Sequence, residues 1–158
     1  MGSDPSVTSR GTGWVVGQLA LGALVVGAGL AGPAWPSSIS SIAEIAGVVL
    51  SAAGAIPFLA GIRALGPSLT PFPAPKDGAT LRDGGVYRLV RHPIYGGVLL
   101  ASAGWSLLTS PLALVPSALL AVFLDLKARR EETWLLDRYP GYEAYRRRVR
   151  WRFVPVIR

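Results

Sequence analysis

The chain has 158 residues, of which 51% are hydrophobic and 16% charged, and its formal net charge at pH 7 is +7. Soluble domains contain about 25% charged residues, so this composition argues against an ordinary soluble domain. Because there is no cysteine and only one histidine, disulfides and thiolate metal ligands are excluded and we expect no metal site. Between Arg10 and Arg63 the only charged residue is Glu44, so the apolar residues form long blocks, as in membrane proteins.

Two transmembrane helices are predicted in residues 13–64, after a polar stretch of residues 1–12 that we expect to be a mobile N-terminus. The first apolar run, residues 14–32, is uncharged and approaches the roughly 20 residues that cross a bilayer. It is longer than the roughly 7–15 apolar residues of a secretory signal, so we favour a membrane span. The second span covers residues 39–62.

Glycine is frequent in the first predicted span, and small residues let helix backbones approach closely. We therefore expect this span to pack within a helical bundle through Gly13, Gly17, Gly22 and Gly27. In the second span, Glu44 lies near the outer end. An acid inside a membrane is a candidate functional residue, but near the interface its side chain can also reach water by snorkelling. The sequence leaves the role of Glu44 open.

Basic residues gather in two stretches, the proline-rich residues 65–91 and the tail of residues 128–158. Residues 92–127 between them are too long for one ordinary span, and Thr109-Ser110-Pro111 predicts a turn that makes them a transmembrane hairpin. Basic loops stay on the cytosolic side, and a hairpin keeps both stretches there. We therefore predict an all-α integral membrane bundle of about four transmembrane helices, with short C-terminal cytosolic helices, cytosolic termini and a place in the cell inner membrane.

The single histidine belongs to the sequence Arg91-His92-Pro93-Ile94-Tyr95-Gly96-Gly97, where the basic loop meets an apolar helix. Proline suits the first turn of a helix, and the free N–H groups there favour an anion such as a carboxylate or a phosphate. The two glycines let a large group approach the backbone. A histidine at a membrane boundary can equally be an interfacial residue, and this motif alone does not decide between the two readings.

Glu131 and Glu132 follow the last predicted span, on the same side of the membrane as His92. Adjacent residues of a helix point about 100° apart, so at most one of the two faces a given pocket squarely. Both could instead pair with Arg129 and Arg130. A helix N-terminus, carboxylates and aromatic rings together suit a ligand that has a carboxylate, a sulfonium, a ribose and an adenine. NADPH would also use basic and aromatic groups.

The second half of the chain resembles the isoprenylcysteine carboxyl methyltransferases, part of a wider group of integral membrane methyltransferases that includes phospholipid methyltransferases. The resemblance rests, in chain order, on Gly85-Val86-Tyr87, the motif from Arg91 to Gly97, Glu131-Glu132, Tyr142, Tyr145, Arg148-Val149 and Pro155. It implies an enzyme that uses S-adenosyl-L-methionine and releases S-adenosyl-L-homocysteine. It also implies that Arg91 and Arg148 are catalytic residues that orient an anionic substrate group. The cofactor-binding residues that it implies are Tyr87, His92, Pro93, Tyr95, Gly96, Glu131, Glu132, Tyr142 and Tyr145.

The resemblance leaves the methyl acceptor and the assembly open. We expect a lipophilic or small acceptor, and an isoprenylcysteine-type carboxylate is one candidate. The family's eukaryotic enzymes often have proline after the Arg-Val pair, where this chain has Arg150, and they carry extra spans. One alternative is an NADPH-dependent membrane reductase related to sterol reductases, and another is a non-enzymatic membrane scaffold. The expected partners are the lipid bilayer and the acceptor, without nucleic acid, and the protein is a monomer or a homodimer.

Overall fold

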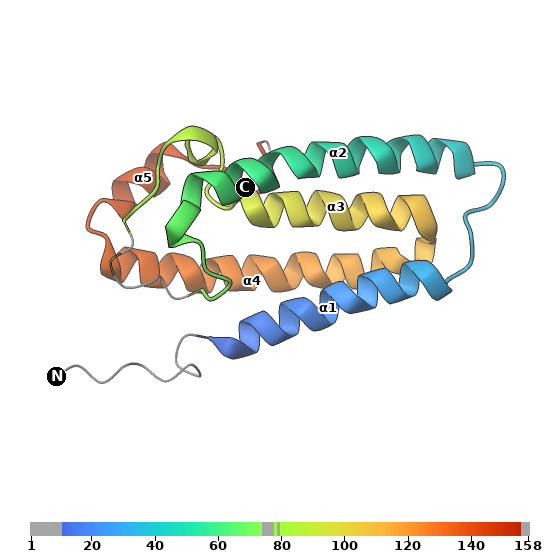
Figure 1. The fold of residues 1–158 in the computed structure, drawn as a ribbon, viewed down its shortest axis with the longest axis horizontal. Coiled ribbons are helices and arrows are strands. Elements are labelled where there is room, and N and C mark those ends of the chain that lie inside the picture. Colours follow the sequence, from blue (N-terminus) through green and yellow to red (C-terminus); the bar gives the residue numbers. More distant parts are fainter. Residues whose placement is uncertain (1–10, 74–77, 79, 156–158) are drawn as a thin grey trace.

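The computed structural model describes residues 11–73, 78 and 80–155, and within these residues it contains helices and no strands (Figure 1). The α-helices are α1 (Thr12–Ala31), α2 (Ser40–Leu65), α3 (Pro93–Thr109), α4 (Leu114–Arg138) and α5 (Tyr142–Arg148). The described connections include the 3-10 helices η2 (Gly66–Ser68), η3 (Gly85–Arg88) and η4 (Pro111–Ala113). The predicted all-α class is confirmed.

Three helical stretches among the described residues are long and apolar enough to cross a membrane, namely Thr12–Ala31, Ser40–Ser68 and Pro111–Arg138. Many of their large apolar side chains are exposed, among them Leu30 and Ile56, as expected for helices that face lipid. α3 has 17 residues, which is at the lower limit of the roughly 17–25 residues that span a bilayer. It runs between α2 and α4 in the bundle (Figure 1). The protein is therefore an integral membrane protein with three candidate spans by length and composition.

The contact between α2 and α3 is the most extensive in the bundle. Glycines recur every seven residues along it, as Gly47, Gly54 and Gly61 in α2 and as Gly97 and Gly104 in α3. A Cβ atom at Gly54 would lie 2.7 Å from the Gly97 carbonyl oxygen, and one at Gly47 would lie 2.9 Å from that of Gly104. A spacing of seven keeps residues on the shared face of two supercoiled helices. These five glycines, the glycine seam, therefore let the two backbones touch along their length.

The first helix, α1, packs more loosely than its glycines predict. Its buried residues are Val25 and Gly29. A Cβ atom at Gly17 would lie 2.7 Å from the Phe123 ring, so this glycine does pack against α4. The prediction is wrong for the other three, because a Cβ atom would meet nothing within 4 Å at Gly13, Gly22 and Gly27, so no close helix contact requires glycine there.

Helices α3 and α4 are antiparallel and are joined at Ser110 (Figure 1). The Ser110 hydroxyl accepts a hydrogen bond from the Leu112 N–H at 3.2 Å, which caps η4 where α3 has just ended. Farther along, the hydroxyls of Ser106 and Ser117 lie 3.0 Å apart and link the two helices, a type of contact common between membrane helices. α4 then continues without a break to Arg138, so one helix carries both an apolar face and the two adjacent glutamates.

The polar elements gather at one end of the bundle, where α2 ends, α3 begins and α4 ends (Figure 1). α5 and the described parts of the connection between α2 and α3 cover this end. A small buried cluster of Tyr87, Tyr142, Tyr145 and Val149 packs these covering elements together. The motif residues that the sequence singled out therefore lie near one another, although they are far apart in the chain.

Candidate functional site

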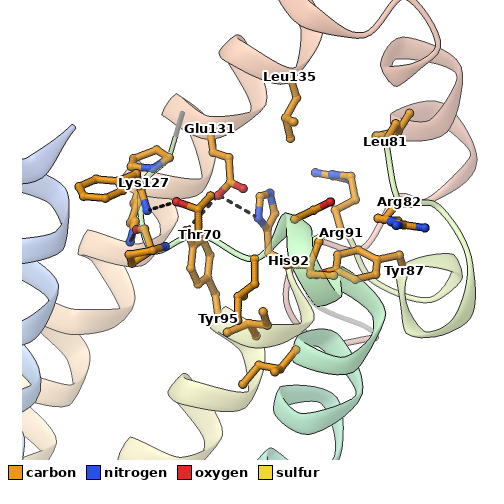
Figure 2. Close-up of a pocket in the computed structure, with 18 of the residues that line it drawn as sticks. Thr70, Leu81, Arg82, Tyr87, Arg91, His92, Tyr95, Lys127, Glu131 and Leu135 are labelled. Atoms are coloured by element: carbon orange, nitrogen blue, oxygen red, sulfur yellow. Dashed lines mark hydrogen bonds and ion pairs between the residues drawn. The ribbon is translucent and has the colours of Figure 1, made fainter. Parts of the chain in front are cut away.

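A cavity of about 350 Å³ lies at the polar end of the bundle (Figure 2). This volume falls within the roughly 300–1,000 Å³ that is typical of small-molecule sites. The end of α2 and the residues after it supply an apolar wall that includes Phe58, Ile62, Leu69 and Phe72. Polar side chains from the other elements complete the lining, and they include Tyr87, Arg91, His92, Tyr95, Lys127, Glu131, Tyr142 and Tyr145.

The only histidine, His92, precedes the first turn of α3, and its backbone is not helical (φ −128°, ψ 65°). Pro93 occupies the first helical position, where the absence of an N–H group costs little. The His92 side chain does not cap the helix. Its ring instead stacks parallel to the Tyr95 ring, with the two centroids 5.4 Å apart. The imidazole is buried, and both of its nitrogens face carboxylates of α4.

Residues 149–153, the C-terminal segment, run beside the start of α3. The backbone N–H groups of Arg91 and His92 donate to two successive carbonyls of this segment, at 3.0 and 2.8 Å. The Arg91 Nη1 atom donates to two further carbonyls of the segment, at 2.7 and 3.0 Å. At Gly96, a Cβ atom would collide with the Phe153 carbonyl oxygen. The motif around His92 is therefore shaped to receive the C-terminal segment.

Glu132 is buried and faces the C-terminal segment. Its Oε1 atom accepts hydrogen bonds from Arg91 Nε at 3.0 Å and from His92 Nε2 at 3.1 Å. The Arg152 guanidinium lies 3.4 Å from the same oxygen and also pairs with Asp125. Glu132 is not part of the cavity lining. Its hydrogen bonds therefore fix the side chains of Arg91 and His92 from outside the cavity.

Glu131 lines the cavity. The Tyr95 hydroxyl donates to its Oε2 atom at 2.9 Å, and His92 Nδ1 lies 3.7 Å from the same oxygen. Because adjacent residues of a helix point about 100° apart, one glutamate faces the cavity while the other faces the C-terminal segment. The sequence left this choice open, and the geometry gives the cavity-facing position to Glu131.

Two tyrosines of α5 differ in how their hydroxyls are satisfied. The Tyr145 hydroxyl donates to the Tyr87 carbonyl at 2.8 Å. Tyr142 is 1% exposed, and its hydroxyl has no hydrogen-bond partner among the described residues. Burial raises the pKa of both hydroxyls, so both stay protonated at neutral pH. A buried polar group without a partner is unfavourable, and a ligand that accepted a hydrogen bond from Tyr142 would remove this penalty.

Lys127 is a cavity residue that the sequence reasoning did not single out. Its ammonium group donates to Gln18 Oε1 at 2.6 Å and to the Pro71 carbonyl at 3.0 Å. It also lies 5.3 Å from the centroid of the Tyr95 ring. A signal was present in the sequence, because Lys127 stands four residues before Glu131 and residues at that spacing share one face of a helix.

Most of the residues predicted for the site lie in the cavity lining, but four do not: Pro93, Gly96, Glu132 and Arg148. Arg148 is exposed and pairs with Asp83 at 2.7 Å, outside the lining. Arg91 does reach the lining, but its guanidinium is engaged by a carboxylate and by backbone carbonyls. The structure therefore brings the predicted aromatic residues and Glu131 together at the cavity. Arg148 stays outside the lining, where its guanidinium lies 5.8 Å from the centroid of the Tyr145 ring.

Comparison with known proteins gives one family match. Residues 42–141 match the model of a family described as phospholipid methyltransferase. Comparisons with curated proteins and with solved structures give no match. The matched region covers more than half of the chain, including α3, α4 and most of α2. It ends before α5 and the C-terminal segment, so Tyr142 and Tyr145 lie outside it.

Proposed function

The chain belongs to the phospholipid methyltransferase family, and from that premise we propose that its cavity binds S-adenosyl-L-methionine and that the methyl group passes to a lipophilic acceptor. At the level of the family, the protein is an integral membrane methyltransferase, and the methyltransferases of this family use S-adenosyl-L-methionine. The resemblance to isoprenylcysteine carboxyl methyltransferases makes a carboxylate on a prenyl-type chain the first acceptor to examine.

We place α3 in the membrane with α1, α2 and α4, which gives four spans. It lies alongside α2 and α4 (Figure 1), and its sequence carries no charged residue. The start of α1 and the C-terminal segment then lie on the same side of the membrane as the cavity. Basic residues are concentrated at this end, which favours the cytosolic side. The membrane that we expect is the cell inner membrane, with the cavity reached by the cofactor from the cytosol.

The Tyr142 hydroxyl is the single observation that carries the cofactor assignment. It is buried against the cavity and unpaired in the described part of the chain, so it can donate to a carboxylate, a ribose oxygen or a ring nitrogen. Glu131 supplies a carboxylate for ribose hydroxyls or for a cationic group. The rings of Tyr87 and Tyr145 offer flat surfaces for an adenine. These residues fit the charge, the hydroxyls and the aromatic ring of S-adenosyl-L-methionine.

When bound, the cofactor supplies a methyl group on a sulfonium, and its carbon–sulfur bond breaks as the bond from methyl to acceptor forms. The protein contributes position and the exclusion of water. Tyr95 and His92 hold Glu131 at a fixed place, where its negative charge binds a positively charged ligand. The apolar wall, with Phe58 and Ile62, keeps water out and accommodates the lipid part of the acceptor. A carboxylate acceptor is already a nucleophile, so it needs no base.

Titration calorimetry of the detergent-purified protein with S-adenosyl-L-homocysteine tests the proposal. We expect binding that Glu131→Gln weakens about tenfold or more, because hydrogen bonds to charged groups are worth roughly 1.5–3 kcal/mol. Glu44→Gln is the matched control, since Glu44 is an exposed carboxylate near the start of α2. A folded protein that binds NADPH and not S-adenosyl-L-homocysteine would support the reductase alternative. One that binds neither would point to a membrane scaffold.

A further inference from the structure

Lys127 is a buried cation on the cavity wall. It is 1% exposed, and both of its hydrogen-bond acceptors are neutral, namely the Gln18 amide oxygen of α1 and the Pro71 carbonyl. Among the residues that the structure describes, no carboxylate forms an ion pair with it. A lysine ammonium has three donors, and these two contacts use two of them. The third donor remains beside the cavity. The charge is offset by the nearby Glu131 carboxylate and by the Tyr95 ring, and not by a direct ion pair among the described residues.

The other cations near the cavity are paired or lie away from its interior. The Arg91 guanidinium is bound to Glu132 and to carbonyls of the C-terminal segment. Arg152 pairs with carboxylates outside the lining. Arg82 reaches the lining but is an exposed residue on the connection between α2 and α3. Lys127 is therefore the buried lining cation that forms no direct ion pair within the described residues, although the Glu131 carboxylate attracts it from one turn away.

The position of Lys127 along α4 separates it from the residues that we assign to the cofactor. It lies about one helical turn before Glu131, a rise of about 6 Å, on the side toward the middle of the bundle (Figures 1 and 2). The tyrosines of α5 lie beyond Glu131, at the polar end. Phe58 and Ile62 of α2 line the same cavity, so an apolar chain has a wall to lie against.

We propose that Lys127 is the specificity-determining residue that recognises an anionic head group of the methyl acceptor, a carboxylate or a phosphate carried on a lipophilic chain. This inference rests on the proposed function, because it assigns the deeper part of the same cavity to the acceptor. It also moves the recognition of the anionic group from Arg91 and Arg148, the arginines that the sequence suggested, to Lys127. The anion would take the third N–H donor and give the buried ammonium a direct ion pair.

The test compares four probes with the same ten-carbon chain: decanoate, decyl phosphate, decylamine and decan-1-ol. Each is titrated into the protein in nanodiscs of neutral lipid, saturated with S-adenosyl-L-homocysteine. We expect at least one of the two anionic probes to bind about tenfold or more tightly than the alcohol, as a charge-assisted hydrogen bond predicts. Decanoate and decyl phosphate are separate arms, so their ranking tells a carboxylate acceptor from a phosphate one.

Three variants tie the preference to this side chain. Lys127→Met removes the charge at nearly constant length and should abolish the preference, whereas Lys127→Arg should keep it. Arg150→Met is the control for the overall positive charge of the protein, because Arg150 is exposed and outside the cavity lining, and it should leave the preference unchanged. A preference that survives Lys127→Met would overturn the assignment. So would an equal loss of binding by all four probes.

Probe binding by the unmodified protein tests the role of Lys127 even if the Lys127→Met variant does not fold. If it binds S-adenosyl-L-homocysteine but binds the anionic probes no better than the alcohol, the role of Lys127 is wrong and the proposed function stands. If it does not bind S-adenosyl-L-homocysteine at all, the proposed function fails first. If Lys127→Met folds and loses S-adenosyl-L-homocysteine binding, the lysine serves the cofactor and the inference is also overturned.

Discussion

The glycine seam and the polar end of the bundle are held together in different ways. Along the seam, α2 and α3 approach until each backbone lies against the other, and a Cβ atom at Gly54 or Gly97 would be within 2.7 Å of the opposite helix's carbonyl oxygen. At the polar end, the start of α3 is held by directed hydrogen bonds from Arg91 and His92 to Glu132 and to the C-terminal segment. The seam is held by close backbone packing at its glycines, and the polar end is held by hydrogen bonds of charged side chains.

The difference indicates that the residues that stabilise the bundle and the residues that line the cavity lie in different parts of the molecule. Close packing of small residues gives membrane helices their attraction where lipid offers no hydrophobic drive. The seam needs no polar group, so it can lie at the depth of the lipid tails. Charged side chains are costly there, and they are concentrated at the end that we place on the cytosolic side. Substitutions in the seam should therefore act on the fold, and substitutions at the polar end on binding.

The largest effect is expected from Gly54→Val in the seam. Its side chain would meet the backbone of α3, which cannot rotate away, so we expect the free energy of unfolding to fall by about 3 kcal/mol or more. Thermal unfolding in detergent measures it. Gly27→Val is the matched control, because a Cβ atom at Gly27 would meet nothing within 4 Å. Equal stability of the two variants would show that α2 and α3 are not in backbone contact.

A smaller effect is expected from Arg91→Lys at the polar end. A lysine cannot reproduce the fork of donors that joins Glu132 to the C-terminal segment, so we expect a loss of about 1–3 kcal/mol. Hydrogen exchange should rise at the amides of residues 91 and 92, which donate to this segment. The control is Arg129→Lys in an exposed pair with Asp125, worth about 0–1 kcal/mol. Unchanged exchange in Arg91→Lys would mean that the guanidinium does not hold the segment.

The smallest effect on stability is expected from Tyr142→Phe. The hydroxyl has no partner in the described protein, so its removal should change the free energy of unfolding by less than about 1 kcal/mol. The affinity for S-adenosyl-L-homocysteine should nevertheless fall by about five- to tenfold, as calorimetry would measure, because one hydrogen bond is worth about 1 kcal/mol.

Tyr145→Phe sharpens this last prediction. The Tyr145 hydroxyl donates to the Tyr87 carbonyl, so its removal leaves a buried acceptor unpaired and should cost more stability than Tyr142→Phe. If Tyr142→Phe were the less stable of the two and kept full affinity, the Tyr142 hydroxyl would have a structural role in place of the proposed cofactor contact.

Helix positions could be predicted from the sequence because long uncharged runs, and the turn residues that separate them, are local signals. The turn residues Thr109-Ser110-Pro111 lie where α3 ends and η4 begins. The sequence also predicted that four polar and aromatic residues would meet at one cavity, because a membrane keeps the polar ends of neighbouring helices at the same membrane surface. These residues are His92, Glu131, Tyr142 and Tyr145. These inferences needed only composition, order and the resemblance.

The contacts that depend on the rotation of a helix could not be predicted. Glu131 and Glu132 are chemically identical neighbours, and only the packing of α4 shows which one faces the cavity. Glycines are frequent in both α1 and α2, but in α2 they recur every seven residues, at Gly47, Gly54 and Gly61. Only the structure shows that these are the positions where the backbone of α2 meets α3. The sequence places Lys127 on one helix face with Glu131, but it does not show the neutral hydrogen-bond partners of Lys127, which come from distant parts of the chain.

The C-terminal segment also sets the order in which the protein can become active during its synthesis. Arg91 binds a carbonyl that lies 58 residues later in the chain. At the usual rate of about 5–20 residues per second, the ribosome needs roughly 3–12 s to make that stretch. During this interval the start of α3 still lacks these hydrogen-bond partners. The polar end of the bundle is therefore the last part that can be completed, because its C-terminal segment is made after all five α-helices.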